Sequence, residues 1–379
     1  MPAQKILFFV DTLELGGLSH VVLVLIAGMR ARGLAVGLGV LEGIVQQPLP
    51  EGAWFRVHEA TRSGRPRGHA PFRRAATEFA RRTIADFEAS FGAADLVIAA
   101  GELAIRCLPG TGTARLVASS HSSQLQAPKH PGWLGKARLA FKRFRRGARL
   151  RRLLNGRHVH VVSHGLATEL TGELRVRPAS LNVIYNPFDI AGIRALSMAS
   201  TPQSELQQQP FVVGVGQFVR RKRFDRLIDA FAESGVDGEL VLIGQGPEEA
   251  VLRARAAERG IGERLRIVPF HPNHHALVRK ARLMVLTSDS EGLPNVLAET
   301  LIVGVPALAT DCPHGPRDIL APIGEHTLVP LSRLDLLSVR IRELTREPYP
   351  IPEAVVQQFA LDRIVDQYVA LTDLFTRPR

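Results

Sequence analysis

Two glutamates in the second half of the sequence stand where a helix is predicted to begin. The segment 288–299, SDSEGLPNVLAE, follows a predicted strand and places Glu291 before the helix and Glu299 inside its first turns. Pro294 suits the first helical position. Backbone N–H groups at a helix start, together with the helix dipole, bind anions such as a diphosphate. The same pattern also fits two solvated glutamates that flank a helix, and the local sequence favours neither interpretation.

A second cluster combines glycine with positive charge. Gly214 and Gly216 end a predicted strand, and Arg220, Arg221 and Lys222 follow a few residues later. Glycine lets the backbone approach a ligand closely, and Arg and Lys side chains neutralise phosphate oxygens. A basic loop by itself is also typical of a solvated surface.

The glycine pattern argues against a nicotinamide-dependent dehydrogenase. Gly244 and Gly246 predict another tight turn after a strand, with an architectural role. Neither glycine group completes the pattern GxGxxG with an acidic residue about 20 positions later, which a dinucleotide site of this kind uses.

These residues need a scaffold, and the sequence predicts two parallel sheets. Short apolar runs alternate with helix-compatible segments, which is typical of strand–helix–strand units. The predicted strands cover residues 6–10, 34–41, 96–100, 116–119, 159–163, 211–216, 240–244, 265–268, 283–287 and 306–309. The predicted helices cover residues 21–29, 226–233, 247–259, 274–280, 295–303 and 352–375. We therefore expect an α/β fold with two Rossmann-like, doubly wound domains that face a central cleft, since ligands bind outside the carboxyl ends of such strands.

Turn and linker composition divides the 379 residues into four parts. Residues 1–188 are expected to form an N-terminal domain, and a Ser-, Gln- and Pro-rich linker covers residues 189–210. Residues 211–351 form the C-terminal domain. Residues 352–379 are expected to form a helix that crosses back to the N-terminal domain.

The net charge of +12 is concentrated in the N-terminal half. Residues 1–185 hold 26 Lys and Arg against 12 Asp and Glu, whereas the remainder holds 22 against 24. This imbalance predicts an anionic partner. A nucleic-acid-binding protein is therefore the alternative function, although no nucleic-acid motif accompanies the charge. With no apolar run of the roughly 18 residues that span a membrane, the protein is expected to be cytoplasmic.

The order of the motifs closely resembles the family 4 retaining glycosyltransferases of GT-B architecture. In chain order the matching features are the Gly16-Gly17 loop, Gly216 with Lys222, the turn at residues 244–247, and Glu291-Gly292-Leu293-Pro294 with seven residues between Glu291 and Glu299. The resemblance covers nearly the whole chain and is strongest over residues 211–320. It implies transfer of a sugar, with retention, from a nucleotide-diphosphate donor, expected to be a UDP-sugar. The implied acceptor is a lipid-linked glycan, a lipopolysaccharide or another polysaccharide of the cell envelope.

The resemblance assigns most of the donor site to the second half. Lys222 would hold the diphosphate, Glu299 the ribose hydroxyls, and Glu291 the hydroxyls of the donor sugar. Phe270, in a turn after Pro269, would lie beside the base. The remaining donor contacts would come from the loop and helix start, at Gly292, Leu293, Pro294, Asn295 and Val296.

The resemblance implies that the N-terminal domain, residues 1–188, binds the acceptor and completes the donor site. The resemblance implies that Gly16 and Gly17 close over the phosphates and that His121, after a predicted strand, lies near the transferred sugar. His121, Lys222 and Glu291 are then the expected catalytic residues.

One position departs from the family pattern. The family usually has Arg directly after the glycine, where this sequence has Gln217, so a bidentate phosphate contact is missing there. We expect Arg220 or Arg221 to supply the charge instead.

No cofactor or metal is expected, because the family stabilises the leaving diphosphate with fixed cations and dipoles. Asp289 and Glu291 have a metal-like but weak spacing. The pair His274-His275 is predicted to lie on a helix surface. Cys312 is predicted to be a buried thiol. The resemblance implies a structural role for the segment 310–320, with Arg317 near the acceptor.

Residues 129–157 carry 11 basic residues interleaved with aromatic and aliphatic ones. A basic amphipathic helix of this kind is typical of a protein that lies on an anionic membrane surface, here the inner face of the cytoplasmic membrane. Its expected membrane or acceptor contacts are Lys142, Arg143, Arg145 and Arg146. A helix that packs its apolar stripe into the domain core fits the pattern equally well.

Overall fold

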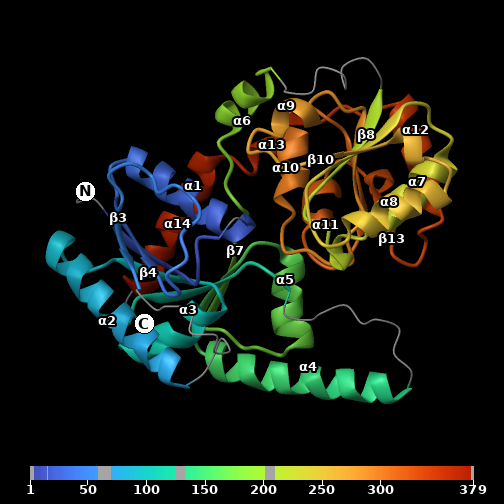
Figure 1. Ribbon diagram of the computed structural model, residues 1–379. Coiled ribbons are helices and arrows are strands. Elements are labelled where there is room, and N and C mark those ends of the chain that lie inside the picture. The colour runs from blue at the N-terminus through green and yellow to red at the C-terminus, as the bar shows by residue number, and fades with distance from the viewer. Residues whose placement is uncertain (1–3, 15, 59–69, 124–132, 201–209, 377–379) are drawn as a thin grey trace. The chain divides into compact units, whose positions relative to one another are not determined.

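The computed structural model describes residues 4–14, 16–58, 70–123, 133–200 and 210–376, which form two compact units (Figure 1). Unit 1 contains Met1–Pro187 and Leu361–Arg379, and unit 2 contains Phe188–Ala360. Each unit is built on its own parallel sheet with helices on both faces. The predicted α/β class with two doubly wound domains is confirmed.

The sheet of unit 1 has seven parallel strands in the order β3-β2-β1-β4-β5-β6-β7. The strands are β1 Lys5–Val10, β2 Ala35–Val40, β3 Trp54–Val57, β4 Leu96–Ala100, β5 Leu116–Ser120, β6 His158–Val161 and β7 Ser180–Val183. The five predicted strands of this half are present within one or two residues. The two strands that the sequence did not predict, β3 and β7, are the two edges of the sheet.

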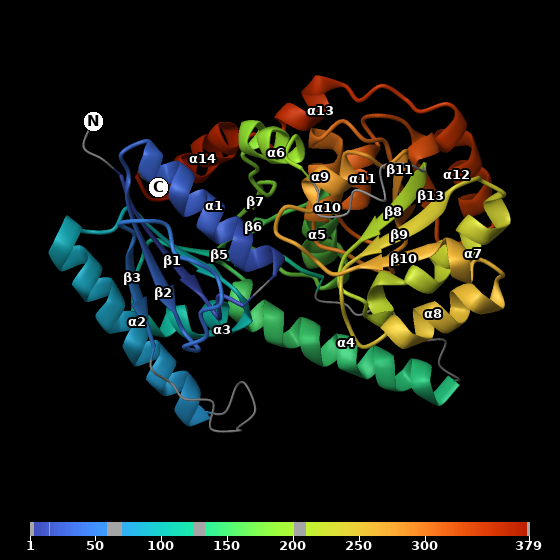
Figure 2. The same ribbon diagram turned by 45° about the horizontal axis from the view of Figure 1, so that its top comes forward.

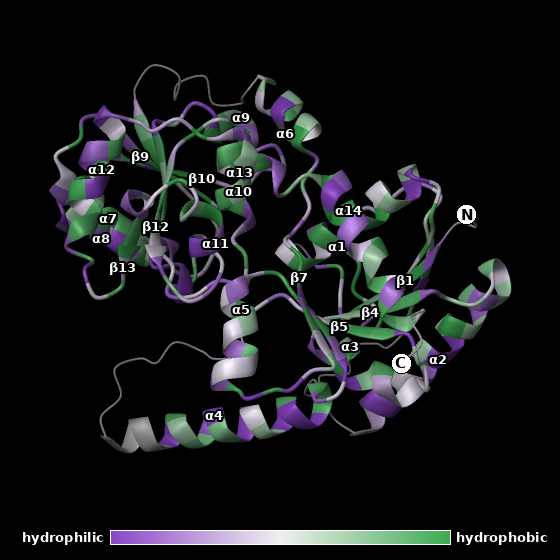
Figure 3. Cartoon of the chain, turned by 180° about the vertical axis from the view of Figure 1, so that it is seen from behind, coloured by the Kyte–Doolittle hydropathy of each residue, from purple (hydrophilic) through white to green (hydrophobic). Residues whose placement is uncertain are grey.

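Helices from both ends of the chain cover the unit 1 sheet. They are α1 Gly17–Ala31, α2 Ala70–Phe91, α3 Glu102–Cys107, α4 Trp133–Leu154, α5 His164–Thr168 and α14 Leu361–Ala370. The N-terminal α1 and the C-terminal α14 lie side by side on one face (Figure 1), where Phe8 packs against Tyr368. On the other face Phe87 of α2 and Leu103 of α3 enter a separate core. The strands are accordingly apolar in Figure 3.

Unit 2 contains a six-stranded parallel sheet in the order β10-β9-β8-β11-β12-β13 (Figure 2). The strands are β8 Phe211–Val215, β9 Glu239–Ile243, β10 Leu265–Val268, β11 Leu283–Leu286, β12 Ala307–Asp311 and β13 Leu328–Pro330. The helices are α6 Ile190–Ser197, α7 Phe224–Ser234, α8 Glu249–Glu258, α9 His275–Val278, α10 Asn295–Ile302, α11 Pro316–Leu320, α12 Leu336–Arg346 and α13 Glu353–Gln357. One core joins residues of α7, α8 and α12 to the central strands.

The connections between the units differ from the sequence prediction. Residues 190–197 of the predicted linker form the helix α6, and residues 201–209 lie outside the described part of the chain. The predicted single helix over 352–375 is two helices, α13 in unit 2 and α14 in unit 1, and a short 3-10 turn. The apolar stripe continues through both helices, but Val355 and Phe359 lie in unit 2 whereas Ile364 and Tyr368 enter the unit 1 core. Periodicity alone therefore could not show that the stripe serves two cores.

Candidate functional site

Glu291 lies at the centre of a charged cluster at the carboxyl edge of the unit 2 sheet. Its side chain is 7% exposed. One carboxylate oxygen accepts hydrogen bonds from Lys222 Nζ at 2.7 Å and from Ser288 Oγ at 2.5 Å, and the other accepts from Arg221 Nη1 at 3.1 Å. Lys222 and Glu291, which the sequence placed in one site, are thus in direct contact.

The cluster keeps the Glu291 carboxylate ionised. Burial acts to raise the pKa of this carboxyl, but the positive charges of Lys222 and Arg221, together with the hydrogen bonds from Lys222 and Ser288, outweigh burial. The pKa therefore lies below its ordinary value. At neutral pH the side chain can accept hydrogen bonds but cannot donate a proton.

Side-chain and backbone hydrogen bonds hold the basic turn Arg220–Lys222 against the end of β11. The Thr287 hydroxyl donates to the carbonyl oxygens of Lys222 and Arg223, at 3.2 and 2.8 Å. The Asp289 amide donates to the carbonyl of Arg221 at 2.8 Å. Arg223 takes a left-handed conformation, with φ of 52°, at the end of this turn. The local fold thus holds Arg221 and Lys222 in place in the absence of a ligand.

Arg221 and Arg220 differ in their surroundings. The Arg221 guanidinium reaches both the Ser290 carbonyl, at 2.6 Å, and Glu291. Both arginines are exposed, and the Arg221 side chain is 48% exposed. What distinguishes Arg221 is its contact with the charged cluster, so the proposal that Arg221 replaces the cation missing at Gln217 rests on that contact.

Asp289 and Glu291 face different cations. Asp289 pairs with Arg226 at 2.7 Å and with Arg223 at 3.5 Å, whereas Glu291 pairs with Lys222 and Arg221. Each carboxylate is neutralised by the protein's own side chains, which supports the expectation that this pair is no metal site.

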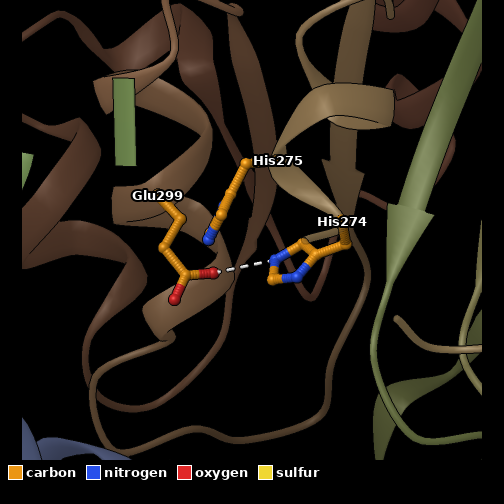
Figure 4. A group of neighbouring side chains, drawn as sticks. All are labelled: His274, His275 and Glu299. Atoms are coloured by element: carbon orange, nitrogen blue, oxygen red, sulfur yellow. Dashed lines mark hydrogen bonds and ion pairs between the residues drawn. The ribbon is translucent and has the colours of Figure 1, made fainter. Parts of the chain in front are cut away.

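Glu299 lies in a second cluster, with His274 and His275 (Figure 4). All three residues are buried, with 7–8% of their surface exposed. His274 Nε2 lies 3.1 Å from a Glu299 carboxylate oxygen, and the two histidine rings are 4.2 Å apart between centroids. The prediction that the histidine pair lies on a helix surface is wrong, because both rings are buried at the start of α9, beside the carboxylate of Glu299.

The same three residues have the composition of a metal site. One ligand atom from each lies within 4.8 Å of the others, and two imidazoles with one carboxylate suit a zinc ion. The alternative is hydrogen bonding alone, in which the His274 ring orients Glu299. The expectation that no metal is needed stays untested.

An exposed aromatic ring continues this second cluster. Phe270 is 49% exposed, and its ring centroid lies 5.3 Å from that of His274. Phe270, His274 and Glu299 thus follow one another over a short distance, with the exposed aromatic surface at one end and the buried carboxylate at the other.

The start of α10 lies between the two glutamates. The helix begins at Asn295. Pro294 is therefore the N-cap residue, one position before the first helical position that the sequence predicted for it. Leu293 and Pro294 are buried, whereas Asn295 and Val296 are half-buried. Gly315 packs onto this loop so closely that a Cβ there would lie 2.6 Å from the Gly292 carbonyl oxygen. The N-cap residue, Pro294, makes no side-chain hydrogen bond to the first turn, and a helix start of this kind can receive an anion.

In unit 1 the loop after β1 carries the predicted glycines. Gly16 directly precedes α1 and Gly17 begins it. Gly16 has an extended backbone, with φ of 176°, and a Cβ placed there would meet nothing within 4 Å. The described structure itself therefore leaves room for a side chain at this position, and a ligand that approaches the backbone is a reason for glycine.

His121 directly follows β5 at the carboxyl edge of the unit 1 sheet. Its Nε2 lies 2.8 Å from the hydroxyl of Ser119, which in turn lies 2.6 Å from Nδ1 of His160. Ser119 and His160 are almost fully buried. The sequence predicts a role for His121 but not for these two partners, because His160 stands 41 residues after Ser119 and no local motif links them.

Two further predictions concern the segment after β12. Cys312 is buried, and burial raises the pKa of its thiol to about 12, so the thiol is unreactive as predicted. Arg317 pairs with Asp311 at 2.6 Å and with Glu325 at 2.8 Å. This supports a structural role for Arg317.

The basic helix α4 combines two environments. Phe141 and Phe144 are 59% and 67% exposed, whereas Leu150 and Leu154 near its end are buried. Lys142, Arg143 and Arg145 are exposed, and Arg146 is half-buried. Figure 3 shows polar and apolar residues interleaved along the helix. The two interpretations of the pattern therefore apply to different parts of α4, and residues 129–132 lie outside the described chain.

No helix in the described part of the chain is long and apolar enough to cross a membrane.

Comparisons with known protein families cover both units. The family described as "Glycosyltransferase Family 4" matches residues 15–191, and "Glycosyl transferases group 1" matches residues 199–358. The second range contains the charged cluster around Glu291 and the cluster around Glu299.

Curated relatives share moderate identity with this chain. It is 28% identical over 222 residues to N-acetyl-alpha-D-glucosaminyl L-malate synthase of Bacillus anthracis, which covers 55% of this chain and 58% of the relative. It is 26% identical over 166 residues to lipopolysaccharide 1,6-galactosyltransferase of Salmonella typhimurium, which covers 42% and 45%. The chain thus spans about half the length of the curated relatives it matches.

Solved structures share the fold. HepE of Anabaena, in a complex with UDP and glucose, superimposes with a TM-score of 0.71 at 19% identity, over 98% of this chain and 100% of that one. Sucrose-phosphate synthase of Thermosynechococcus elongatus superimposes with a TM-score of 0.73 at 18% identity, over 98% and 99%. The chain belongs to the family 4 glycosyltransferases, enzymes that transfer sugars, and has their two-domain GT-B fold.

Proposed function

We propose that the protein is a retaining glycosyltransferase that needs no metal and moves a sugar from a UDP-sugar to a lipid-linked or polysaccharide acceptor of the cell envelope. The contact of Lys222 and Arg221 with Glu291, beside the start of α10, carries the proposal. Fixed cations and a helix start stabilise the charge that develops on a departing diphosphate without a metal ion.

The second cluster supports a nucleoside on the same side of α10. Glu299 offers carboxylate oxygens that accept hydrogen bonds from ribose hydroxyls, and His274 orients that carboxylate. The exposed ring of Phe270 offers a surface for the base. HepE was solved with UDP and with UDP-glucose, which supports uridine as the first base to test.

The nature of the relatives supports an envelope acceptor. Two of them are a lipopolysaccharide galactosyltransferase and a transferase that acts on a diphospho-undecaprenol-linked glycan. The family matches favour a glycosyltransferase over the alternative function, a nucleic-acid-binding protein.

The exposed part of α4 supports binding to an anionic surface at the inner face of the cytoplasmic membrane. Phe141 and Phe144 are exposed beside Lys142, Arg143 and Arg145, a combination that suits an anionic lipid interface.

A panel of UDP- and GDP-sugars in the presence of EDTA tests the proposal by thermal unfolding. A ligand that binds the folded state raises the unfolding temperature according to its affinity. We expect at least one UDP-sugar to stabilise the wild-type protein with EDTA present, and Glu299→Ala to lose most of that shift. If none of the nucleotide sugars stabilises the protein, the proposed donor class is wrong; if stabilisation needs an added metal, the metal-independent mechanism is wrong.

A further inference from the structure

A buried chain of hydrogen bonds at the carboxyl edge of the unit 1 sheet ends on His121. The Ser119 hydroxyl oxygen lies 2.6 Å from His160 Nδ1 and 2.8 Å from His121 Nε2. His160 Nε2 lies 3.0 Å from the carbonyl oxygen of Ile184. Because Ser119 and His160 are 1% and 0% exposed, solvent does not compete for these bonds.

The proton positions in this chain of hydrogen bonds follow from the Ile184 carbonyl, which can only accept a hydrogen bond. A backbone carbonyl has no proton, so His160 Nε2 must donate to Ile184. A neutral imidazole carries a single ring proton, which leaves Nδ1 of His160 as an acceptor for the Ser119 hydroxyl. Ser119 has then used its only proton and can only accept from His121 Nε2.

Both rings are neutral at pH 7, as this assignment requires. Burial lowers the pKa of His160 to about 4, although its bond to Ile184 acts in the opposite direction. Burial, with a smaller contribution from His160, lowers the pKa of His121 to about 3.

Tyr368 of α14 packs against the His160 ring of this chain of hydrogen bonds. Its ring centroid lies 5.1 Å from that of His160, and Tyr368 is 2% exposed. This contact helps to keep solvent away from Ser119 and His160.

The outcome is a fixed acceptor at the end of the chain. His121 carries its proton on Nε2, so Nδ1 has a free lone pair. This atom is buried and has no hydrogen-bond partner among the described residues. Buried polar atoms are nearly always paired in folded proteins, so an unpaired acceptor at the carboxyl edge of a parallel sheet points to a ligand.

We propose that Ser119 and His160 are positioning residues that hold His121 with Nδ1 unprotonated, so that it accepts a hydrogen bond from a hydroxyl or N–H group of the bound sugar. This inference rests on the proposed function. A sugar that presents only an acceptor at this point, such as a carboxylate or a fluorine in place of the hydroxyl, is disfavoured by the same geometry.

The protonation state can be measured without any donor. In the full chain with 15N-labelled histidine, the resonances of His121 are assigned by comparison with His121→Gln. We expect a protonated Nε2 and an unprotonated Nδ1 that do not titrate between pH 6 and 8. Ser119→Ala should mix in the form protonated at Nδ1. Protonation at Nδ1 in the wild-type protein, or an unchanged His121 spectrum in Ser119→Ala, would overturn the proposal.

Binding of UDP-glucose and UDP then tests the consequence. Each affinity is measured for wild type, Ser119→Ala and His160→Gln, and the UDP-sugar that stabilises best in the donor panel replaces UDP-glucose if it differs. Because the contact is to the sugar, we expect both variants to weaken UDP-glucose binding about tenfold, the size of one lost hydrogen bond, and to leave UDP binding unchanged. An equal loss for both ligands would indicate a merely structural role, and no loss for either would remove the proposed contact.

Ser180→Ala is the matched control. The Ser180 hydroxyl lies 2.8 Å from His158 Nδ1, on two neighbouring strands of the same sheet. The variant therefore removes a similar Ser–His hydrogen bond that does not involve His121. Both affinities should stay unchanged in this variant. If no UDP-sugar binds the wild-type protein, the proposed function fails, whereas the protonation of His121 still decides the inference about Ser119 and His160.

Discussion

The two units present opposite chemistry at the carboxyl edges of their sheets. In unit 2 a buried carboxylate, Glu291, is held by two cations, Lys222 and Arg221. In unit 1 the corresponding edge presents the glycines Gly16 and Gly17 and the neutral ring of His121. The excess positive charge of the N-terminal half is exposed on α4 instead. Under the proposed function, the cations of unit 2 would bind the charged diphosphate, whereas the neutral ring of His121 in unit 1 would contact an uncharged group of the sugar.

Removal of Lys222 should give the largest effect. Lys222→Ala takes away a fixed cation and leaves Glu291 buried with only Arg221 as a positive partner. We expect a loss of about 10²–10³-fold in kcat, the size found when one preorganised charge-stabilising group is removed. Sugar transfer or donor hydrolysis measures it, with Arg340→Ala, an exposed residue of α12, as the control. A kcat within threefold of wild type would contradict a role for Lys222 in stabilising the charge of the leaving diphosphate.

The second prediction tests whether the exposed positive charge of α4 binds an anionic membrane surface. Arg143→Gln with Arg145→Gln should weaken binding to anionic vesicles about 10- to 30-fold, since each basic residue near such a surface contributes about 1 kcal/mol. Sedimentation with vesicles at two salt concentrations measures it. Arg149→Gln is the matched control, because Arg149 on the same helix is already paired with Glu102 at 2.9 Å. Binding that is unchanged in the double variant would leave α4 without a role at the membrane.

The third prediction separates two neighbouring arginines. Arg221→Ala should weaken UDP binding about tenfold, because a charge-assisted hydrogen bond to phosphate is lost. Arg220→Ala should change it less than twofold. Calorimetric titration of UDP decides the matter, and equal effects of the two variants would show that Arg221 does not replace the cation missing at Gln217.

The fourth prediction concerns the pH dependence of stability. Because the pKa of Glu291 is lower in the folded protein than its ordinary value of 4.5, the carboxylate stabilises the fold above that pH, and this contribution is lost as the pH falls through the folded pKa. Glu291→Gln should therefore lower the unfolding temperature at pH 7 and have a smaller effect at pH 3. An equal effect at both values would mean that the ion pairs do not stabilise the charged form.

The sequence could predict the interior of both sheets but only one of their four edge strands, β10. The nine central strands are buried along most of their length, and most of them are apolar runs, which explains that signal. The edge strands β3, β7 and β13 were not predicted. β3 is half-exposed, and its sequence, Trp-Phe-Arg-Val, is interrupted by a charge. α2 was missed for a similar reason, since polar and basic residues cover most of its surface.

The candidate site divides in the same way. Glu291, Glu299 and Lys222 stand in motifs whose spacing is visible in the sequence. The inward orientation of His274 depends on a carboxylate 25 residues away, and that of His160 on a hydroxyl 41 residues away. Such contacts arise only when separate strands and helices pack together, so local patterns do not contain them.

The central claim, that the cations of unit 2 receive a diphosphate, is tested most directly by comparing UDP with UMP. Calorimetric titrations of both nucleotides into wild type and Lys222→Ala, at two salt concentrations, give the contribution of the second phosphate. We predict that UDP binds wild type at least tenfold more tightly than UMP, and that this difference shrinks in Lys222→Ala and at high salt. Equal affinity for UDP and UMP in wild type, or a difference that Lys222→Ala leaves intact, would contradict the claim.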